Sequence, residues 1–417
     1  EDRLEVISNI TLTSNTTGAR FGTAVALVDI NQDGLLDVAA SSPNLGQWDG
    51  NLSLWEYYEE SYNGRVDIFL GQPGGGVSTI PDIIILPDAP EDPFTNLGMS
   101  LAAGDCNGDG HLDLLIGSPY ASELGYQRGQ AAVVLARNTT LPANATVSTV
   151  ANMVVSGVDY EWLGNAMSCA AGHVAISAPG SRPSGLQGEG AVYLFDSPSL
   201  ADVAKRPSPL AKISSGSFMS QLGQSVAFST DGAVLALGAP SYNGERNRSQ
   251  AGGVMLVPVA GLSGEVWLTD GYDNVTAIAK FCAVGMQPFA RFGWSVLLTD
   301  MDGDGNDDLV VSEPFRITAI DGAEEGAIYI WTDIHSRMLA NSGAATCADA
   351  GAASVRLDHH DREGRFGSAL AAADVTTSSS KGKDLVVGGH MQGEPKGETD
   401  RGRQVGGVHL LVRPAMK

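Results

Sequence analysis

Long apolar runs and basic residues are what this sequence has least of. No uninterrupted apolar stretch reaches 18 residues, so we expect no membrane-spanning helix. Only 25 Lys and Arg stand against 48 Asp and Glu, which leaves a net charge of −23. Because so acidic a surface repels a polyanion, nucleic acid is not expected as a partner. The excess acid can form a solvated surface, or part of it can bind metal ions.

Recognisable catalytic motifs are also missing. The sequence contains no G-x-S-x-G, H-E-x-x-H or P-loop pattern, and its seven histidines are scattered. The four cysteines include no C-x-x-C pair, which argues against a zinc site built on thiolates. We therefore predict no catalytic residue in this chain, and we leave open whether a larger protein that contains it is an enzyme.

Acceptor sites for N-glycosylation are frequent. The pattern N-x-[ST] occurs seven times, mostly in polar stretches that are typical of loops. The acceptor residues are Asn9, Asn15, Asn51, Asn138, Asn144, Asn247 and Asn274. Seven such sequons favour passage through the secretory pathway, so we expect an extracellular or secreted protein, either free or associated with the cell surface.

An oxidising compartment permits two disulfides among the four cysteines. Three pairings are possible. We prefer Cys106–Cys169 together with Cys282–Cys347, and the sequence leaves the other two pairings open.

An internal repeat organises the sequence. Each unit opens with Phe or Leu followed by Gly, and successive openings lie 59 to 76 residues apart. The six openings are Phe21-Gly22, Leu97-Gly98, Leu163-Gly164, Leu222-Gly223, Phe292-Gly293 and Phe366-Gly367. A short alternating strand follows each opening, and a second strand ends in a corner of small residues, as in Gly238-Ala239-Pro240. A third and a weaker fourth apolar run complete the unit, as in 64–70 and 83–86.

Four short strands per unit are typical of a β-propeller blade. The 52 glycines fit the many tight turns that such blades need. A series of separate β-sandwiches would need about 100 residues per domain, which exceeds the observed spacing. No blade can bury both faces alone, so neighbouring blades must stack. We therefore predict an all-β fold, with residues 1–417 forming a single β-propeller domain of four-stranded blades.

Three of the units carry a nine-residue acidic loop between their first two strands. Side-chain oxygens at positions 1, 3, 5 and 9 and the backbone carbonyl at position 7 can converge, because Gly at position 6 permits a sharp reversal. The candidate metal ligands are Asp29, Asn31, Asp33, Leu35 and Asp37; Asp105, Asn107, Asp109, His111 and Asp113; and Asp300, Asp302, Asp304, Asn306 and Asp308.

Calcium suits these loops, because it takes six to eight oxygen ligands in a flexible cage and magnesium demands a stricter octahedron. An EF-hand needs Glu at position 12 and flanking helices, whereas position 12 here is Ala40, Ile116 or Val311 between strands. A plain Asx-Gly turn explains one such loop but not three at equivalent places. We expect about three Ca²⁺ ions. The third loop has the most carboxylates and should bind most tightly.

The Phe-Gly openings, the Gly-Ala-Pro corner and the acidic loops resemble the FG-GAP repeats of integrin α-subunit heads. The series of opening variants resembles more closely the C-terminal propeller of the glycosylphosphatidylinositol-specific phospholipase D family. Both families have seven blades, whereas six repeats are visible here. Residues 4–12 are typical of a lone strand that would pair with the last blade and close a six-bladed ring. The alternative is that a seventh blade lies outside this chain.

The two resemblances imply different functions. The phospholipase resemblance implies a calcium-binding, non-catalytic scaffold or interaction domain, whose catalytic segment would precede it and is not part of this sequence. The integrin resemblance implies an adhesion or matrix module that binds extracellular protein partners. A structural subunit of an extracellular assembly is a third hypothesis.

Overall fold

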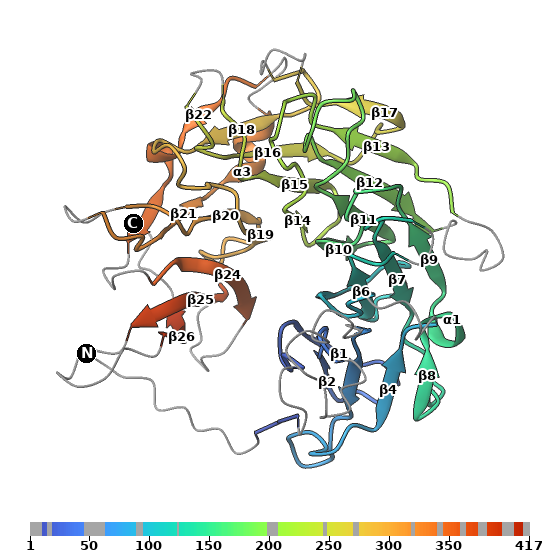
Figure 1. Cartoon of the computed structure of the whole chain (residues 1–417). Helices are drawn as coiled ribbons and strands as arrows, with labels where there is room; N and C mark the ends of the chain where they lie inside the picture. Colours follow the sequence, from blue (N-terminus) through green and yellow to red (C-terminus); the bar gives the residue numbers. More distant parts are fainter. Residues whose placement is uncertain are drawn as a thin grey trace, which may run out of the picture. The chain divides into compact units, whose positions relative to one another are not determined.

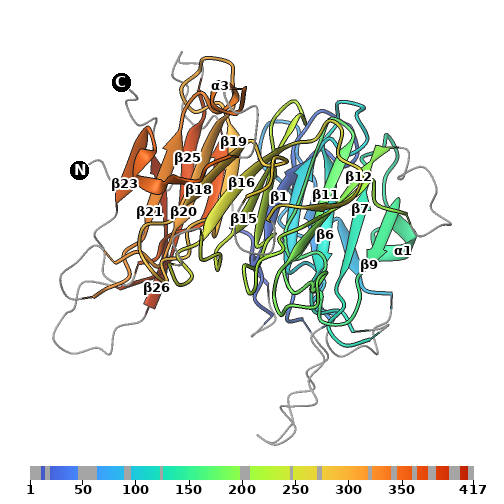
Figure 2. The same ribbon diagram turned by 90° about the horizontal axis from the view of Figure 1, so that it is seen from above.

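The computed structural model is almost entirely β-sheet (Figures 1 and 2). It describes residues 11–14, 19–45, 63–88, 95–122, 125–197, 207–244, 248–269, 275–317, 322–339, 345–358, 364–373, 382–393 and 404–411. The chain divides into two compact units, Glu1–Ser181 with Val192–Lys212 and Arg182–Ala191 with Ile213–Lys417. No helix among the described residues is long and apolar enough to cross a membrane.

The first unit contains three sheets in chain order. Their strands are β1 (Val25–Val28), β2 (Asp37–Ser41), β3 (Val66–Phe69), β4 (Ile83–Leu86) and β8 (Asn144–Thr146); β5 (Ser100–Gly104), β6 (Asp113–Ser118), β7 (Gln130–Val134) and β9 (Met153–Ser156); and β10 (Met167–Ala170), β11 (His173–Ala178) and β12 (Ala191–Asp196). In the first two sheets neighbouring strands are antiparallel, except that β8 pairs with β4 in parallel. The short helix α1 (Val147–Val150) follows β8.

The second unit also contains three sheets. Their strands are β14 (Ser225–Phe228), β15 (Val234–Ala239), β16 (Gly253–Pro258), β18 (Phe281–Val284) and β22 (Ala348–Asp349); β19 (Val296–Thr299), β20 (Asp308–Glu313), β21 (Ala327–Trp331) and β23 (Val355–Asp358); and β24 (Phe366–Ala373), β25 (Asp384–Gly393) and β26 (Gln404–Leu411). Here too the added strand β22 pairs in parallel, with β18. The remaining elements are β13 (Ala211–Ser214), β17 (Gly264–Trp267), α3 (Ile334–Leu339) and the 3₁₀ turn η2 (Ala350–Ala352).

All six repeat openings share one backbone conformation. The residue before the Phe or Leu has a positive φ, at 54° for Arg20, 48° for Asn96, 56° for Trp162, 54° for Gln221, 62° for Arg291 and 44° for Arg365. The Gly that follows has φ between 82° and 93° in every case, a region that favours glycine. In the first repeat the N–H of Gly22 donates to the carbonyl of Ser41 at the end of the second strand, at 2.8 Å. Four further repeats make the same bond, so the described residues confirm the predicted repeat.

Central strands bury both faces, because successive side chains of a strand point to opposite sides. On β6, Leu114 and Ile116 pack in a core with the first sheet, whereas Leu115 packs in a core with the third. In the second unit, β21 sends Tyr329 into one core and Ile330 into another. Within each unit the sheets therefore stack face to face as propeller blades do, which confirms the predicted all-β propeller fold.

The preferred disulfide pairing is confirmed. Cys106 is bonded to Cys169, and Cys282 is bonded to Cys347. The second bond lies beside the parallel pairing of β18 with β22, where Ala283 faces Ala348. Covalent links thus reinforce a contact between successive repeats in each unit.

Some sequence predictions fall on residues that the structure does not describe. Residues 4–10 of the expected closing strand lie outside the described residues, so the single closed domain over 1–417 stays a prediction. The same holds for the sequons at Asn9, Asn15, Asn51, Asn247 and Asn274. Asn138 and Asn144 are described, and both are exposed.

Candidate metal centre

The three acidic loops are β-hairpin loops, between β1 and β2, β5 and β6, and β19 and β20. Their ninth residue is also the first residue of the second strand. Strand register places it opposite the last residue of the first strand, in the pairs Val28↔Asp37, Gly104↔Asp113 and Thr299↔Asp308. The ninth aspartate therefore stands at the neck of each loop, where at most 1% of it is exposed.

The glycine at position 6 reverses each loop, as the sequence predicted. Its φ is 85° at Gly34, 86° at Gly110 and 94° at Gly305. Its N–H donates to Oδ2 of the aspartate at position 1, at 2.9 Å in the first loop and 3.0 Å in the other two. This bond fixes the orientation of the first carboxylate.

Position 5 is oriented in the same way in all three loops. The N–H of position 7 donates to the position-5 carboxylate, at 2.8 Å from Leu35 to Asp33, 2.9 Å from His111 to Asp109 and 2.7 Å from Asn306 to Asp304. Backbone N–H groups thus orient the carboxylates at positions 1 and 5 in each loop, but among the described residues three acidic side chains converge within 4.8 Å only in the third loop.

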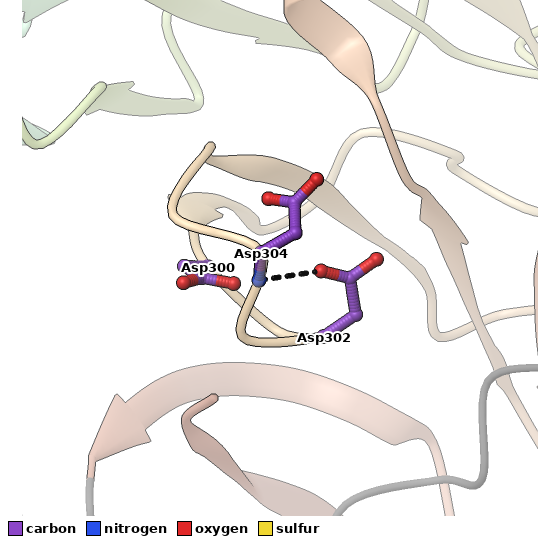
Figure 3. Close-up of side chains that lie close together, drawn as sticks. All are labelled: Asp300, Asp302 and Asp304. Carbon is purple, nitrogen blue, oxygen red and sulfur yellow. Dashed lines mark hydrogen bonds between the residues drawn. The ribbon is translucent and has the colours of Figure 1, made fainter. Parts of the chain in front are cut away.

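The third loop forms a cluster of carboxylates. One oxygen each of Asp300, Asp302 and Asp304 lies within 4.8 Å of the others. Figure 3 shows the three side chains around the loop, with the N–H of Asp304 donating to Oδ1 of Asp302 at 3.1 Å. In the first two loops position 3 is an asparagine instead, and Nδ2 of Asn31 donates to Asp33 at 2.9 Å. The third loop therefore concentrates more negative charge than the others.

Burial raises the pKa of the ninth aspartate in each loop. Desolvation is the largest cause, and neighbouring carboxylates add to it. The pKa of Asp113 rises to about 6 and that of Asp308 to about 7. For Asp113, hydrogen bonds from the N–H groups of Cys106 and Ala136 oppose the rise. A bound cation would stabilise the ionised form of these side chains.

Asp308 differs from its two counterparts in its hydrogen bonds. Oδ1 of Asp37 and of Asp113 each accepts an N–H from beyond the third strand, at 2.8 Å. Oδ1 of Asp308 is buried and accepts no hydrogen bond of good geometry from the described residues, although the N–H of Asp333 is near enough to lower its pKa. Asp308 is not part of the cluster of Asp300, Asp302 and Asp304, but it interacts with Asp302, and an oxygen with unused acceptor capacity there fits the ligand set of a hard cation.

One contact of the third loop was not anticipated from its sequence. Asp307, at position 8, accepts hydrogen bonds from the N–H and hydroxyl of Thr230, at 2.6 and 2.8 Å. Thr230 lies in the short turn of the preceding repeat, which has no acidic set. The two residues are 77 positions apart, so no local pattern signals this contact.

Comparison with known proteins finds the same repeat in the units that carry the acidic loops. The FG-GAP repeat family matches residues 21–69, 97–135 and 292–331, the three units that carry the acidic loops. Phosphatidylinositol-glycan-specific phospholipase D of Rattus norvegicus is 28% identical over 401 residues, covering 88% of this chain and 44% of the relative. The Homo sapiens protein of that name is 27% identical over 392 residues with the same coverage.

Integrin subunits match over a shorter stretch. Integrin alpha-IIb of Mus musculus is 34% identical over 125 residues, which are 30% of this chain and 11% of the relative. This chain spans less than half the length of the phospholipases it matches. The chain contains FG-GAP repeats, and it is similar over most of its length to part of the phosphatidylinositol-glycan-specific phospholipases D and more distantly to integrin α subunits.

Proposed function

We propose that this chain is a calcium-binding, non-catalytic propeller that acts as a scaffold or interaction domain of an extracellular, phospholipase D-like protein. The observation that carries the calcium assignment is the recurrence of one loop geometry at three equivalent hairpins. In each loop backbone N–H groups hold the carboxylates at positions 1 and 5, and the aspartate at position 9 is buried. Oxygen-only ligand sets of this kind suit calcium.

The ion would act by compensating charge. Without a cation, three or four acidic side chains share each loop, and their mutual repulsion opposes the folded hairpin. Coordination replaces that repulsion and fixes the first two strands of a blade relative to each other. The ligands are the residues at positions 1, 3, 5, 7 and 9 identified above.

Contacts to the next repeat support a scaffolding role. A backbone carbonyl near the start of each acidic loop accepts an N–H from the following repeat: Ile30 from Arg137 at 3.1 Å, Asp105 from Gly172 at 3.2 Å and Asp300 from Lys383 at 3.0 Å. Ordering a loop would therefore also order its junction with the following repeat.

The extracellular assignment rests on the two disulfides and on the seven sequons. The relatives are named as phospholipases and this chain spans less than half of their length, so we place the chemistry of a larger protein on a segment outside this chain. An adhesion or matrix module that binds extracellular proteins is the second candidate, which the integrin similarity favours.

Calorimetric titration of the chelated protein with Ca²⁺ tests the proposal. We expect about three equivalents, with affinities on the order of 10⁻⁴–10⁻³ M, and weaker binding of Mg²⁺ in a parallel titration. A stoichiometry of zero would show that the loops are only turns.

The non-catalytic role has its own test. The purified chain should release no glycosylphosphatidylinositol-anchored protein from membranes, with an active phospholipase of this type as the positive control. Turnover by the chain alone would overturn this part of the proposal.

A further inference from the structure

The second acidic loop has a cysteine where the other two loops have an aliphatic or thioether side chain. Position 2 is Cys106 here, and Ile30 and Met301 in the first and third loops. In all three loops the N–H of this residue donates to Oδ2 of the ninth aspartate at 2.9 Å. Position 2 therefore contacts one candidate ligand directly and stands between two others in the chain.

Cys106 is fully buried and bonded to Cys169 on β10, in the next repeat. The residues on either side are held by that repeat as well. The carbonyl of Asp105 accepts the N–H of Gly172 at 3.2 Å, and the carbonyl of Asn107 accepts the hydroxyl of Ser197 at 3.0 Å. Three consecutive residues of the loop, two of them candidate ligands, are thus fixed from outside the loop.

The approach of the two repeats is close at this point. A Cβ atom on Gly104, the residue before the loop, would lie 2.1 Å from the carbonyl oxygen of Cys169. Only glycine permits the two backbones to come together here. The first and third loops have no covalent link to a neighbouring repeat, because the chain's only other disulfide joins Cys282 to Cys347.

We propose that the Cys106–Cys169 disulfide positions the ligands of the second calcium site, so that its calcium affinity depends on the redox state of this bond. The inference rests on the proposed calcium function. The disulfide restricts the calcium-free loop to conformations close to the calcium-bound one. The loop therefore loses less conformational entropy when it binds calcium, and binding is stronger. Linkage is reciprocal, so calcium must protect this disulfide by the same factor by which the disulfide strengthens calcium binding.

The redox step is ordinary thiol–disulfide exchange. A small dithiol attacks the bond through its thiolate, passes through a mixed disulfide and leaves as a cyclic disulfide. Two electrons and two protons are transferred, and both cysteines become thiols. The loop then keeps its carboxylates but loses its covalent attachment to β10.

A matched pair of variants tests the effect on binding. The background carries Asp33→Asn and Asp304→Asn, so that only the second site binds calcium. The first variant carries Cys106→Ile and Cys169→Ala, so that position 2 of this loop has the isoleucine found in the first loop. Without the disulfide, calcium should bind about tenfold more weakly, which is within the usual range of coupling between two sites. Cys282→Ala with Cys347→Ala is the control and should leave the dissociation constant unchanged. Equal affinities in the two variants would overturn the proposal.

The unmodified protein provides a second test that does not depend on how well a variant folds. Reduction by dithiothreitol is brought to equilibrium in calcium or in chelator, and each cysteine pair is quantified by alkylation and mass spectrometry. Calcium should make Cys106–Cys169 about tenfold harder to reduce and leave Cys282–Cys347 unchanged. An equal shift of both bonds, or of neither, would contradict the coupling. If titration shows no calcium binding at all, the proposed function fails with it; three bound ions with no redox effect would overturn the coupling alone.

Discussion

At the scale of single residues, the ninth aspartate of each loop serves both the backbone and the candidate site. Oδ2 of Asp37 accepts the N–H of Ile30 inside the loop, and Oδ1 accepts the N–H of Gly71 beyond the third strand, at 2.9 and 2.8 Å. One buried side chain thus ties three strands of a blade together. Its charge is costly to bury, which is why its pKa rises when no cation is present.

Asp304→Asn should lower the calcium stoichiometry from about three to about two, because a carboxylate of the densest cluster is lost. Asp307→Asn is the control. It makes the same change of charge in the same loop, but Asp307 already accepts hydrogen bonds from Thr230 and should not be a ligand. Titration calorimetry of both variants separates the two roles. Three ions bound to Asp304→Asn, or two bound to Asp307→Asn, would contradict the assignment.

Proton release on calcium binding should depend on pH. In the calcium-free protein the pKa values of Asp113 and Asp308 are about 6 and about 7, above the value of about 3.9 in an unfolded chain. Between these values the folded state holds protons that the unfolded state has lost, so the stability of the calcium-free protein falls as pH rises from about 4 to about 7. Calcium needs the ionised carboxylates, so binding should release protons at pH 6 and almost none at pH 9.

Calorimetry at pH 6 in buffers of different ionisation enthalpy counts these protons. Asp113→Asn should reduce the number released. Identical heats in all buffers at pH 6 would show that the ninth aspartates are already ionised before calcium binds.

At the scale of elements, the repeat opening depends on a glycine with positive φ, but its surroundings differ between repeats. Gly22 and Gly98 have φ of 82° and 84°. A Cβ on Gly22 would meet nothing within 4 Å, whereas a Cβ on Gly98 would lie 2.6 Å from Cβ of Ser41 and 2.9 Å from Cγ2 of Val66. The second glycine is therefore needed for packing as well as for backbone conformation.

Gly22→Ala should lower the free energy of unfolding by about 1–2 kcal/mol, the cost of a left-handed alanine. Gly98→Ala should cost about 1–3 kcal/mol more, because the added methyl group forces the packed side chains apart. Denaturant unfolding of the two variants measures the difference. Equal losses would mean that the two openings pack alike.

The parallel strands that extend the sheets are a further feature of this scale. β8 lies between β7 and β9 in the chain but pairs with β4 of the preceding sheet, with Ala145 beside Ile85. β22 repeats this arrangement in the second unit. Asn144, one of the predicted glycan acceptors, is the first residue of β8, and its side chain is exposed.

At the scale of the whole molecule, calcium should stabilise the fold without being essential to it. The apolar cores between neighbouring sheets do not involve the loops' carboxylates. Each site should add roughly 2.7 kcal/mol at a hundredfold excess of calcium over its dissociation constant. Thermal melting should therefore shift downward in chelator while the β-sheet circular dichroism spectrum persists at low temperature. Equal melting temperatures with calcium and with chelator would argue against folded-state binding.

Passage through the secretory pathway should leave glycans on the native protein, with Asn138 and Asn144 foremost because both are exposed. Intact mass should fall on treatment with an N-glycosidase. Asn138→Gln and Asn144→Gln should each remove one glycan when the protein is expressed in secreting cells. Protein from its native source with no mass change would contradict the secretory assignment.

The features predicted correctly from the sequence depend on short stretches of chain. Six Phe-Gly or Leu-Gly openings at regular spacing indicated the blades, because each reflects a local backbone requirement for positive φ. The acidic loops were equally visible, since the glycine at position 6 is near in the chain to the position-1 carboxylate that accepts its N–H. The preferred disulfides also join successive repeats.

What only the tertiary structure decided is which distant groups meet. Asp307 contacts Thr230, which is 77 positions away, and Asn107 is held by Ser197, which is 90 positions away. Asp105 is also held by the next repeat, and β8 pairs in parallel with β4 of the preceding sheet. Such contacts depend on how one blade stacks on the next, and that stacking is set by apolar side chains spread over both sheets. The sequence by itself determined the repeat and the acidic loops, because both follow from local chemistry. The surroundings that set the charge and mobility of each candidate ligand followed only from the packing.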